Sequence, residues 1–411
     1  MKNLLMERAG KTLSNGLRVV YRPSLSDIAY CGFAVDAGTR DEAENEQGMA
    51  HFVEHLLFKG TKKRKAWHIL NRMEAVGGDL NAYTNKEEMV VYSAFLSEDM
   101  PRAVELLIDI VFHSTFPQRE IEKETEVIID EIQSYEDNPS ELIFDDFEDM
   151  IFRGHSLGRN ILGRPEQLRQ FRTDDALAFT NRLYHPSNMV FFFQGNVDFK
   201  RLIRMLEKLM ADVPAGEVKN LRTPPPLYVP EHLIVSKDTH QAHVMLGSRG
   251  YDAYDDKRTA LYLLNNILGG PGMNSRLNVA LRERRGLVYS VESNLTSYTD
   301  TGAFCIYFGT DPEDVDTCLN LTYKELKRMR DVKMTSLQLE AAKKQLIGQI
   351  LVASDNFENN ALGMAKTFLH YNKFEDLDIV CKRIDALTAN NLLEVANEMF
   401  AEEYLSTLIY K

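Results

Sequence analysis

Residues 48–60 read GMAHFVEHLLFKG, a stretch made up mostly of apolar residues and glycine. Its apolar residues predict a helix that is apolar nearly all round, and therefore buried. Three ionisable residues, His51, Glu54 and His55, interrupt it and fall on one arc of the helix at about 100° per residue. A buried carboxylate needs a cation, a metal or strong hydrogen bonds, because an isolated charge is very costly there.

The two histidines are spaced as metal ligands would be. At positions i and i+4, His51 and His55 can direct imidazole nitrogens at one point, which suits Zn²⁺. Glu54 flanks that point and could take a proton from a zinc-bound water as a general base. The alternative is a pair of core histidines with ordinary hydrogen-bond partners. The complete HxxEH pattern on a buried helix favours the metal site.

A zinc site of this kind needs a third protein ligand. A long helix is predicted from about Gln118 to Tyr135, and Glu124 and Glu131 lie two turns apart beside its apolar stripe. Either carboxylate could reach a metal held by the first helix. On this helix alone, an acidic surface helix is the simpler interpretation.

Composition limits the class of protein. The chain has 411 residues, 44% hydrophobic and 27% charged, as expected for a soluble globular protein of two or three domains. A net charge of −13 argues against nucleic acid as a partner. No window approaches the ~18 apolar residues of a membrane span, and no signal sequence is evident. Four scattered cysteines fit reduced thiols, so we expect a cytoplasmic protein with no membrane partner.

The two halves of the chain follow the same order of elements. Residues 213–230 hold five of the thirteen prolines and read as a linker near the midpoint. On both sides of it, strands and helices alternate in the same series. We predict an α+β fold of two homologous domains from a duplication, each a mostly antiparallel β-sheet packed with α-helices. The predicted boundaries are 1–215 for a zinc-binding catalytic domain, 216–230 for the proline-rich linker, and 231–411 for a homologous domain that lacks the metal motif and completes the substrate cavity.

The second half lacks the ionisable groups of the first. HFVEH aligns with LYLLN at residues 261–265, and the positions that match Glu124 and Glu131 are Ala342 and Gln349. If the groups served the fold alone, the duplicate would need something similar. Their loss favours a chemical role in the first half.

HFVEH followed by EKETEVIIDEI resembles the inverzincins, the zinc peptidases related to pitrilysin, insulin-degrading enzyme and mitochondrial processing peptidase. In that family the third ligand is a glutamate that matches Glu131, which lies 76 residues beyond His55. A second family glutamate, seven residues earlier, matches Glu124 and supports the site from behind. The resemblance therefore implies that His51, His55 and Glu131 hold Zn²⁺.

The resemblance extends to substrate-binding segments. NAYTNKE matches a family segment in which Asn81-Ala82 would lie on a sheet edge where the peptide substrate adds as a strand. NSRLNVALRERRGLVYSV matches one in which Arg282 would hold the substrate carbonyl and Tyr289 would steady the oxyanion. Taken alone, NAYT fits an ordinary strand, and Arg282 is one charge in RERR.

The resemblance implies a zinc endopeptidase that hydrolyses peptides or unstructured segments inside a closed chamber. The shorter family members assemble from two subunits, so we expect a homodimer or a heterodimer with a related subunit. Two alternatives stay open: a non-catalytic subunit, and an enzyme that acts only with a different partner chain.

Overall fold

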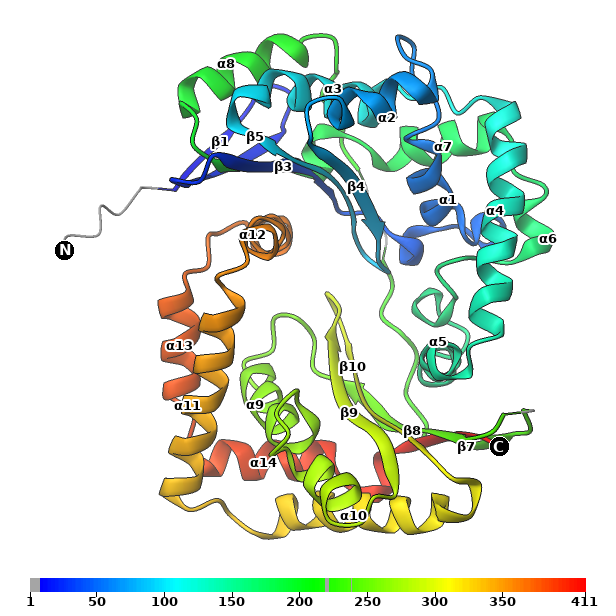
Figure 1. Ribbon diagram of the computed structural model, residues 1–411, viewed down its shortest axis with the longest axis vertical. Coiled ribbons are helices and arrows are strands. Elements are labelled where there is room, and N and C mark those ends of the chain that lie inside the picture. Colours follow the sequence, from blue (N-terminus) through cyan, green and yellow to red (C-terminus); the bar gives the residue numbers. More distant parts are fainter. Residues whose placement is uncertain (1–7, 219–221, 238) are drawn as a thin grey trace. The chain divides into compact units, whose positions relative to one another are not determined.

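The computed structural model describes residues 8–218, 222–237 and 239–411, and the chain folds into two compact units (Figure 1). Neither unit is a continuous stretch of sequence. The first comprises residues up to 132, 159–222 and 354–375. The second comprises residues 133–158, 223–353 and 376–411.

A six-stranded sheet forms the centre of the first unit, in the order β1-β2-β6-β3-β5-β4. The strands are β1 (Ala9–Thr12), β2 (Arg18–Pro23), β3 (Ile28–Val35), β4 (Asp79–Thr84), β5 (Met89–Leu96) and β6 (Met189–Gly195). All neighbours are antiparallel except β2 and β6. Every residue of β6 is buried, which explains why MVFFFQG carries no polar alternation.

Helices cover this sheet. Those of the first unit are α1 (Met49–Leu56), α2 (Ala66–Glu74), α3 (Met100–Phe112), α6 (Pro165–Leu168), α7 (Thr173–Leu183), α8 (Phe199–Leu209) and α12 (Phe357–Tyr371), together with most of α4 (Gln118–Glu136). The predicted helix 118–135 is thus confirmed. One side of α3 is apolar and packs on β3 and β5.

A five-stranded sheet forms the centre of the second unit, in the order β7-β11-β8-β10-β9. Its strands are β7 (His232–Val235), β8 (Ala242–Gly250), β9 (Val288–Ser297), β10 (Gly302–Thr310) and β11 (Ser406–Tyr410). Its helices are α5 (Pro139–Ile151), α9 (Arg258–Gly269), α10 (Val315–Asp331), α11 (Ser336–Ala353), α13 (Leu377–Asp385) and α14 (Ala389–Met399). A π-helical segment, Asn278–Glu283, precedes β9.

The two sheets share one topology. From β2 to β4 the first sheet has one parallel pair followed by three antiparallel pairs, and the second sheet has the same series from β7 to β9. Thus β2 corresponds to β7, and β4 corresponds to β9. The predicted α+β fold with two duplicated, mostly antiparallel sheets is confirmed. Strand β1 is an addition to the first sheet without a described counterpart in the second.

Each unit includes one helix from the other half of the sequence. Helix α12 packs on β2, β3 and β6 through Ala361, Ala365 and Leu369, which join a cluster of buried residues of the first sheet. Helix α5 packs on β8 and β11 of the second sheet in the same way. The predicted domain boundaries at residues 215 and 231 remain a prediction, and residues 219–221 of the predicted linker lie outside the described residues.

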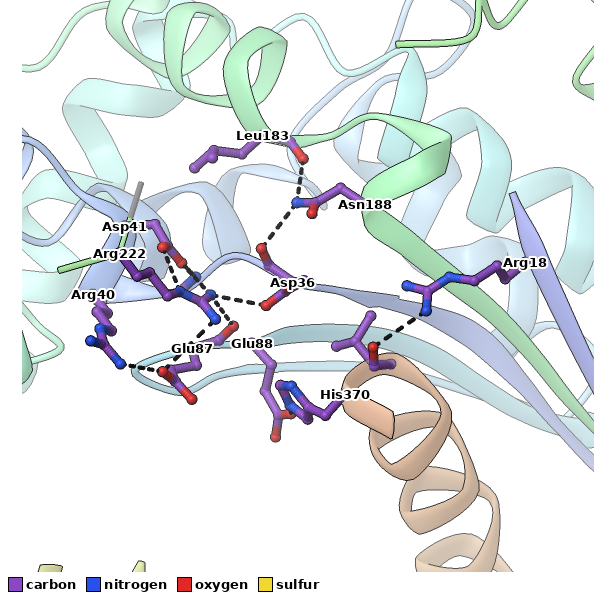
Figure 2. A network of polar contacts seen from close by, with 12 residues as sticks. Arg18, Asp36, Arg40, Asp41, Glu87, Glu88, Leu183, Asn188, Arg222 and His370 are labelled. Atoms are coloured by element: carbon purple, nitrogen blue, oxygen red, sulfur yellow. Dashed lines mark hydrogen bonds and ion pairs between the residues drawn. The ribbon is translucent and has the colours of Figure 1, made fainter. Parts of the chain in front are cut away.

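A polar network fastens α12 and the end of the proline-rich segment to the first sheet (Figure 2). Glu88 accepts hydrogen bonds from Lys366 at 2.6 Å and His370 at 3.0 Å. Burial alone would raise the pKa of Glu88, but these two donors lower it to about 2. Arg222 donates to both carboxylate oxygens of Asp41, at 2.8 and 2.7 Å. The charges of this buried network are therefore paired, as buried charges need to be.

Candidate metal centre

Helix α1 is buried along most of its length, as its apolar residues predict. The residue that precedes it, Gly48, has a φ of +92°, in the left-handed region that favours glycine. A Cβ at this position would also lie 2.8 Å from the Cα of Gly163. Gly48 therefore lets the chain turn sharply into α1 beside another segment.

Helices α1 and α4 bring three ligand-type side chains together. One ligand atom from each of His51, His55 and Glu131 lies within 4.8 Å of the other two. The Glu131 carboxylate is 3.9 Å from Nε2 of His51 and 3.8 Å from Nε2 of His55. Both helices belong to the first unit at these positions. Across the described residues of the second unit, no comparable group of ligand atoms occurs.

This set of donors fits zinc. Two imidazole nitrogens and one carboxylate oxygen are zinc ligands, and three protein ligands leave a fourth tetrahedral position open. Donors on a common tetrahedral ion at about 2.1 Å would lie about 3.4 Å apart, so the distances here require only small side-chain movements. The three side chains could therefore hold one zinc ion.

Glu124 contacts one histidine of this cluster and is not among its three ligand-type residues. Its carboxylate is 3.2 Å from Nδ1 of His55 and forms an ion pair with Lys59 at 2.7 Å. Burial would raise the pKa of Glu124, but hydrogen bonds from His55 and Lys59 lower it overall. An ionised Glu124 fixes the tautomer of His55 with Nε2 free to accept a metal. The contact with Lys59 was not predicted from the sequence.

Burial shifts the pKa values of two side chains on α1, Glu54 and His51. It raises the pKa of Glu54, with Glu131 adding to the rise and Thr84 and His55 opposing it. Burial and the neighbouring His55 lower the pKa of His51 to about 4. His51 is thus a neutral imidazole at pH 7, as a metal ligand must be. Glu54 gains the basicity that suits a general base.

Strand β4 brings the predicted substrate-binding pair beside α1. Asn81 pairs with Tyr92 and Ala82 with Val91 on the neighbouring strand, and β4 is the edge of its sheet. Asn81 is exposed and Ala82 is half-buried. Strand β4 also contacts α1. An added strand could therefore pair here close to the histidines.

The structure places Arg282 and Tyr289 in the second unit. Arg282 belongs to the π-helical segment, and Tyr289 lies on β9, the edge strand of that sheet. Both are exposed, and both line a cavity of about 520 Å³. Their predicted position facing the metal stays a prediction.

Glu42 is a further residue of this site that sequence reasoning missed. It is buried, and its carboxylate accepts hydrogen bonds from the backbone N–H groups of Gly48 at 3.0 Å and Ala50 at 2.8 Å. Backbone N–H groups at the start of a helix have no partner within the helix itself, and Glu42 supplies one from outside. A helix cap normally lies within the adjacent residues, so the six-residue separation hid this one. Glu42 anchors the helix that carries both histidines.

Replacing Glu42 by Gln is expected to destabilise the protein by about 1–3 kcal/mol, because the amide can satisfy only one of the two donors. Burial raises the pKa of Glu42 to about 8. Since this exceeds the unfolded value, the stability contributed by Glu42 is complete below about pH 4.3 and is lost as pH rises through 8. Urea unfolding at pH 5 and pH 8 checks this. The difference in the free energy of unfolding between wild type and Glu42→Gln should be smaller at pH 8 than at pH 5. An equal difference at both pH values would contradict this prediction.

Two family models match most of the chain. Residues 18–165 match the family model described as insulinase, peptidase family M16. Residues 170–346 match the model described as peptidase M16 inactive domain. All three ligand-type residues thus lie within the match to the peptidase model. Among the described residues of 170–346, which match the inactive-domain model, no group of metal-ligand atoms converges.

Whole-length relatives carry zinc protease names. A protein of Bacillus subtilis called uncharacterized zinc protease YmxG is 33% identical, over 97% of each chain. An uncharacterized zinc protease of Rickettsia bellii is 32% identical, over 97% of this chain and 96% of its own. Among solved structures, a protease from Helicobacter pylori has a TM-score of 0.92 at 22% identity, covering 98% of this chain and 99% of its own. An M16 structure from Pseudomonas fluorescens has a TM-score of 0.91 at 20% identity, covering 98% of each chain.

Proposed function

The chain belongs to the insulinase family of peptidases, M16, and we propose that it is a zinc-dependent endopeptidase that cuts peptides or unstructured polypeptide segments. The zinc protease names of its relatives support a metallopeptidase. One observation carries the proposal: His51, His55 and Glu131 converge on one point beside the half-buried carboxylate Glu54. A fold requirement alone would not assemble these four groups.

In this proposal each side chain has a separate role. His51, His55 and Glu131 hold the metal, which when bound supplies a Lewis acid that polarises the scissile carbonyl and acidifies water. Glu54 takes a proton from the attacking water and later delivers it to the leaving amine. Its raised pKa helps the first transfer, because a stronger base accepts a proton more readily near neutral pH. Glu124 orients His55 and does not touch the substrate.

The substrate would bind through backbone pairing to the free edge of β4. Asn81 and Ala82 would then hold an extended segment beside α1 with little regard for its side chains. Arg282 and Tyr289 would contact the carbonyl and the oxyanion from the second unit, inside a closed chamber. A strand-pairing mode favours unfolded chains, because a folded protein offers few unpaired backbone groups.

The partners and location follow from the same proposal. Besides the peptide substrate, we propose a second subunit, either another copy or a related chain, and no nucleic-acid or membrane partner. Within the described residues no helix has the length and apolar character needed to cross a membrane. We propose a cytoplasmic location.

Metal content and cleavage measured on one preparation test the function. The purified chain is expected to contain about one zinc per chain and to cleave a mixed peptide pool. A chelator should abolish cleavage, and zinc should restore it. A chain that binds no zinc would favour the non-catalytic subunit. A zinc-loaded chain that cuts nothing until a related subunit is added would favour the partner-dependent enzyme.

A further inference from the structure

The outer edge of the second sheet is an exposed apolar strand. Every residue of β7 is exposed, and Leu233, Ile234 and Val235 are 39%, 62% and 37% accessible. Strand β11 flanks β7 on one side, and no strand of the described residues flanks the other. Natural proteins usually protect such an edge with charges, proline or a covering segment, since it pairs readily with other chains.

The corresponding edge of the first sheet is covered. There β1 pairs antiparallel with β2, the counterpart of β7, from Ala9 opposite Tyr21 to Thr12 opposite Arg18. The apolar residues Val19 and Val20 of β2 are 1% and 0% exposed. The duplicated architecture therefore accommodates one more antiparallel strand at this position. In the second unit, the described part of the chain does not supply it.

The backbone of β7 is oriented to accept that strand. Thr407 donates to the carbonyl of Glu231, Lys411 donates to that of Val235, and the N–H of Lys237 donates to Lys411. In a parallel ladder, alternate residues direct their backbone groups toward the same neighbour. The odd-numbered residues thus bond to β11. The N–H and C=O groups of 232, 234 and 236 face outward.

We infer that β7 is an assembly surface, which pairs antiparallel with β7 of a second copy of this chain about a two-fold axis at Ile234. In this register Ile234 lies opposite Ile234 and residue 232 lies opposite 236, so the outward backbone groups meet. Leu233 lies opposite Val235, and Glu231 lies opposite Lys237. Two five-stranded sheets then become one continuous ten-stranded sheet.

Side-chain chemistry selects this register. Moving the axis to residue 233 would place Glu231 opposite Val235, and moving it to 235 would place Leu233 opposite Lys237. Only the register centred on Ile234 pairs apolar with apolar and acid with base. Glu231 already accepts an ion pair from Arg153 at 2.9 Å, and Lys237 lies 5.0 Å from the ring centre of Tyr410. The new charge pairs therefore set the register and add little affinity.

The occupant is a second copy because the strand is complementary to itself. A two-fold pair uses the same patch on both subunits and closes, so it stops at two copies. A pair of short strands lies at the small end of specific interfaces, where complexes are weak. We therefore expect dissociation constants in the micromolar range. This inference is independent of the proposed peptidase activity.

Sedimentation equilibrium of the full-length protein from ~1 to ~200 μM tests the inference. The wild type should pass from monomer to dimer in this range. Ile234→Pro removes an outward N–H and leaves the bonds to β11, so the dissociation constant should rise roughly tenfold or more. Leu337→Lys, at a residue 83% exposed on the same unit, is the matched control and should dimerise like the wild type. Circular dichroism establishes that Ile234→Pro is folded.

Two charge variants test the register without depending on proline. Lys237→Glu and Glu231→Lys should each dimerise more weakly than the wild type, because like charges then face each other. An equimolar mixture should recover dimers, because both charge pairs are restored between unlike copies. A monomer at 200 μM, an unaffected Ile234→Pro dimer, or a mixture no stronger than its components would each overturn the inference.

Discussion

Replacing Glu54 by Gln is expected to lower kcat for peptide cleavage by about 10²–10⁴-fold while zinc stays bound. The amide has nearly the shape of the carboxylate but cannot accept a proton from water. Glu54 is not among the three residues whose ligand atoms converge, so the metal content should not change. Burial raises the pKa of the native carboxyl, which makes it the side chain suited to this proton transfer.

The measurement compares initial rates on one peptide with zinc content determined on the same samples. Glu74→Gln, an exposed position on α2, is a matched control and should retain wild-type rates. Retained cleavage by zinc-loaded Glu54→Gln, within about threefold of wild type, would remove Glu54 from the chemistry. A lowered rate accompanied by lost zinc would instead assign it to metal binding.

Three glutamates of helix α4 are expected to give a graded loss of zinc. Glu131→Gln removes a ligand and should weaken zinc binding by more than 100-fold, with cleavage falling to background. Glu124→Gln removes the partner that orients His55 and should weaken zinc binding by about 10–100-fold. Glu126→Gln, exposed on the same helix, should have no effect. The order follows from how many contacts separate each carboxylate from the metal.

Competition with a zinc chelator of known affinity measures this series, with peptide cleavage as a second readout. His55→Ala should lose about as much zinc affinity as Glu131→Gln, because it removes both a ligand and the contact with Glu124. Equal zinc affinities for the Glu131 and Glu126 variants would show that Glu131 is not a ligand. Equal losses for Glu124 and Glu131 would mean that both carboxylates bind the metal directly.

The sequence predicted the part of the site that lies within one helix. His51, Glu54 and His55 share an arc because helical periodicity alone fixes their directions. Glu131 could be predicted as the third ligand only from the family spacing, since helical periodicity did not distinguish it from Glu124. Each half was also predictable as strands and helices, because hydrophobic patterning is local.

What the sequence did not predict depends on contacts between distant residues. The caps and ion pairs around α1, such as those made by Glu42 and Lys59, join separate segments and leave no local pattern. The same holds for the packing of α12, because helical periodicity does not say which sheet a helix covers. Strand β1 was missed because four mostly exposed residues carry little hydrophobic signal.

The exchange of helices between the halves also determines when each part of the chain can finish folding during its synthesis. The first sheet is complete once β6 has been made, yet its cover, α12, lies more than 150 residues further along the chain. At ~5–20 residues per second, this delay is on the order of 10–30 s. Until then Val20, Ala34 and Val190 have no helix over them. A nascent chain of this protein should therefore expose an apolar sheet face that chaperones recognise, and splitting the gene at its proline-rich midpoint should leave two fragments that fold only together.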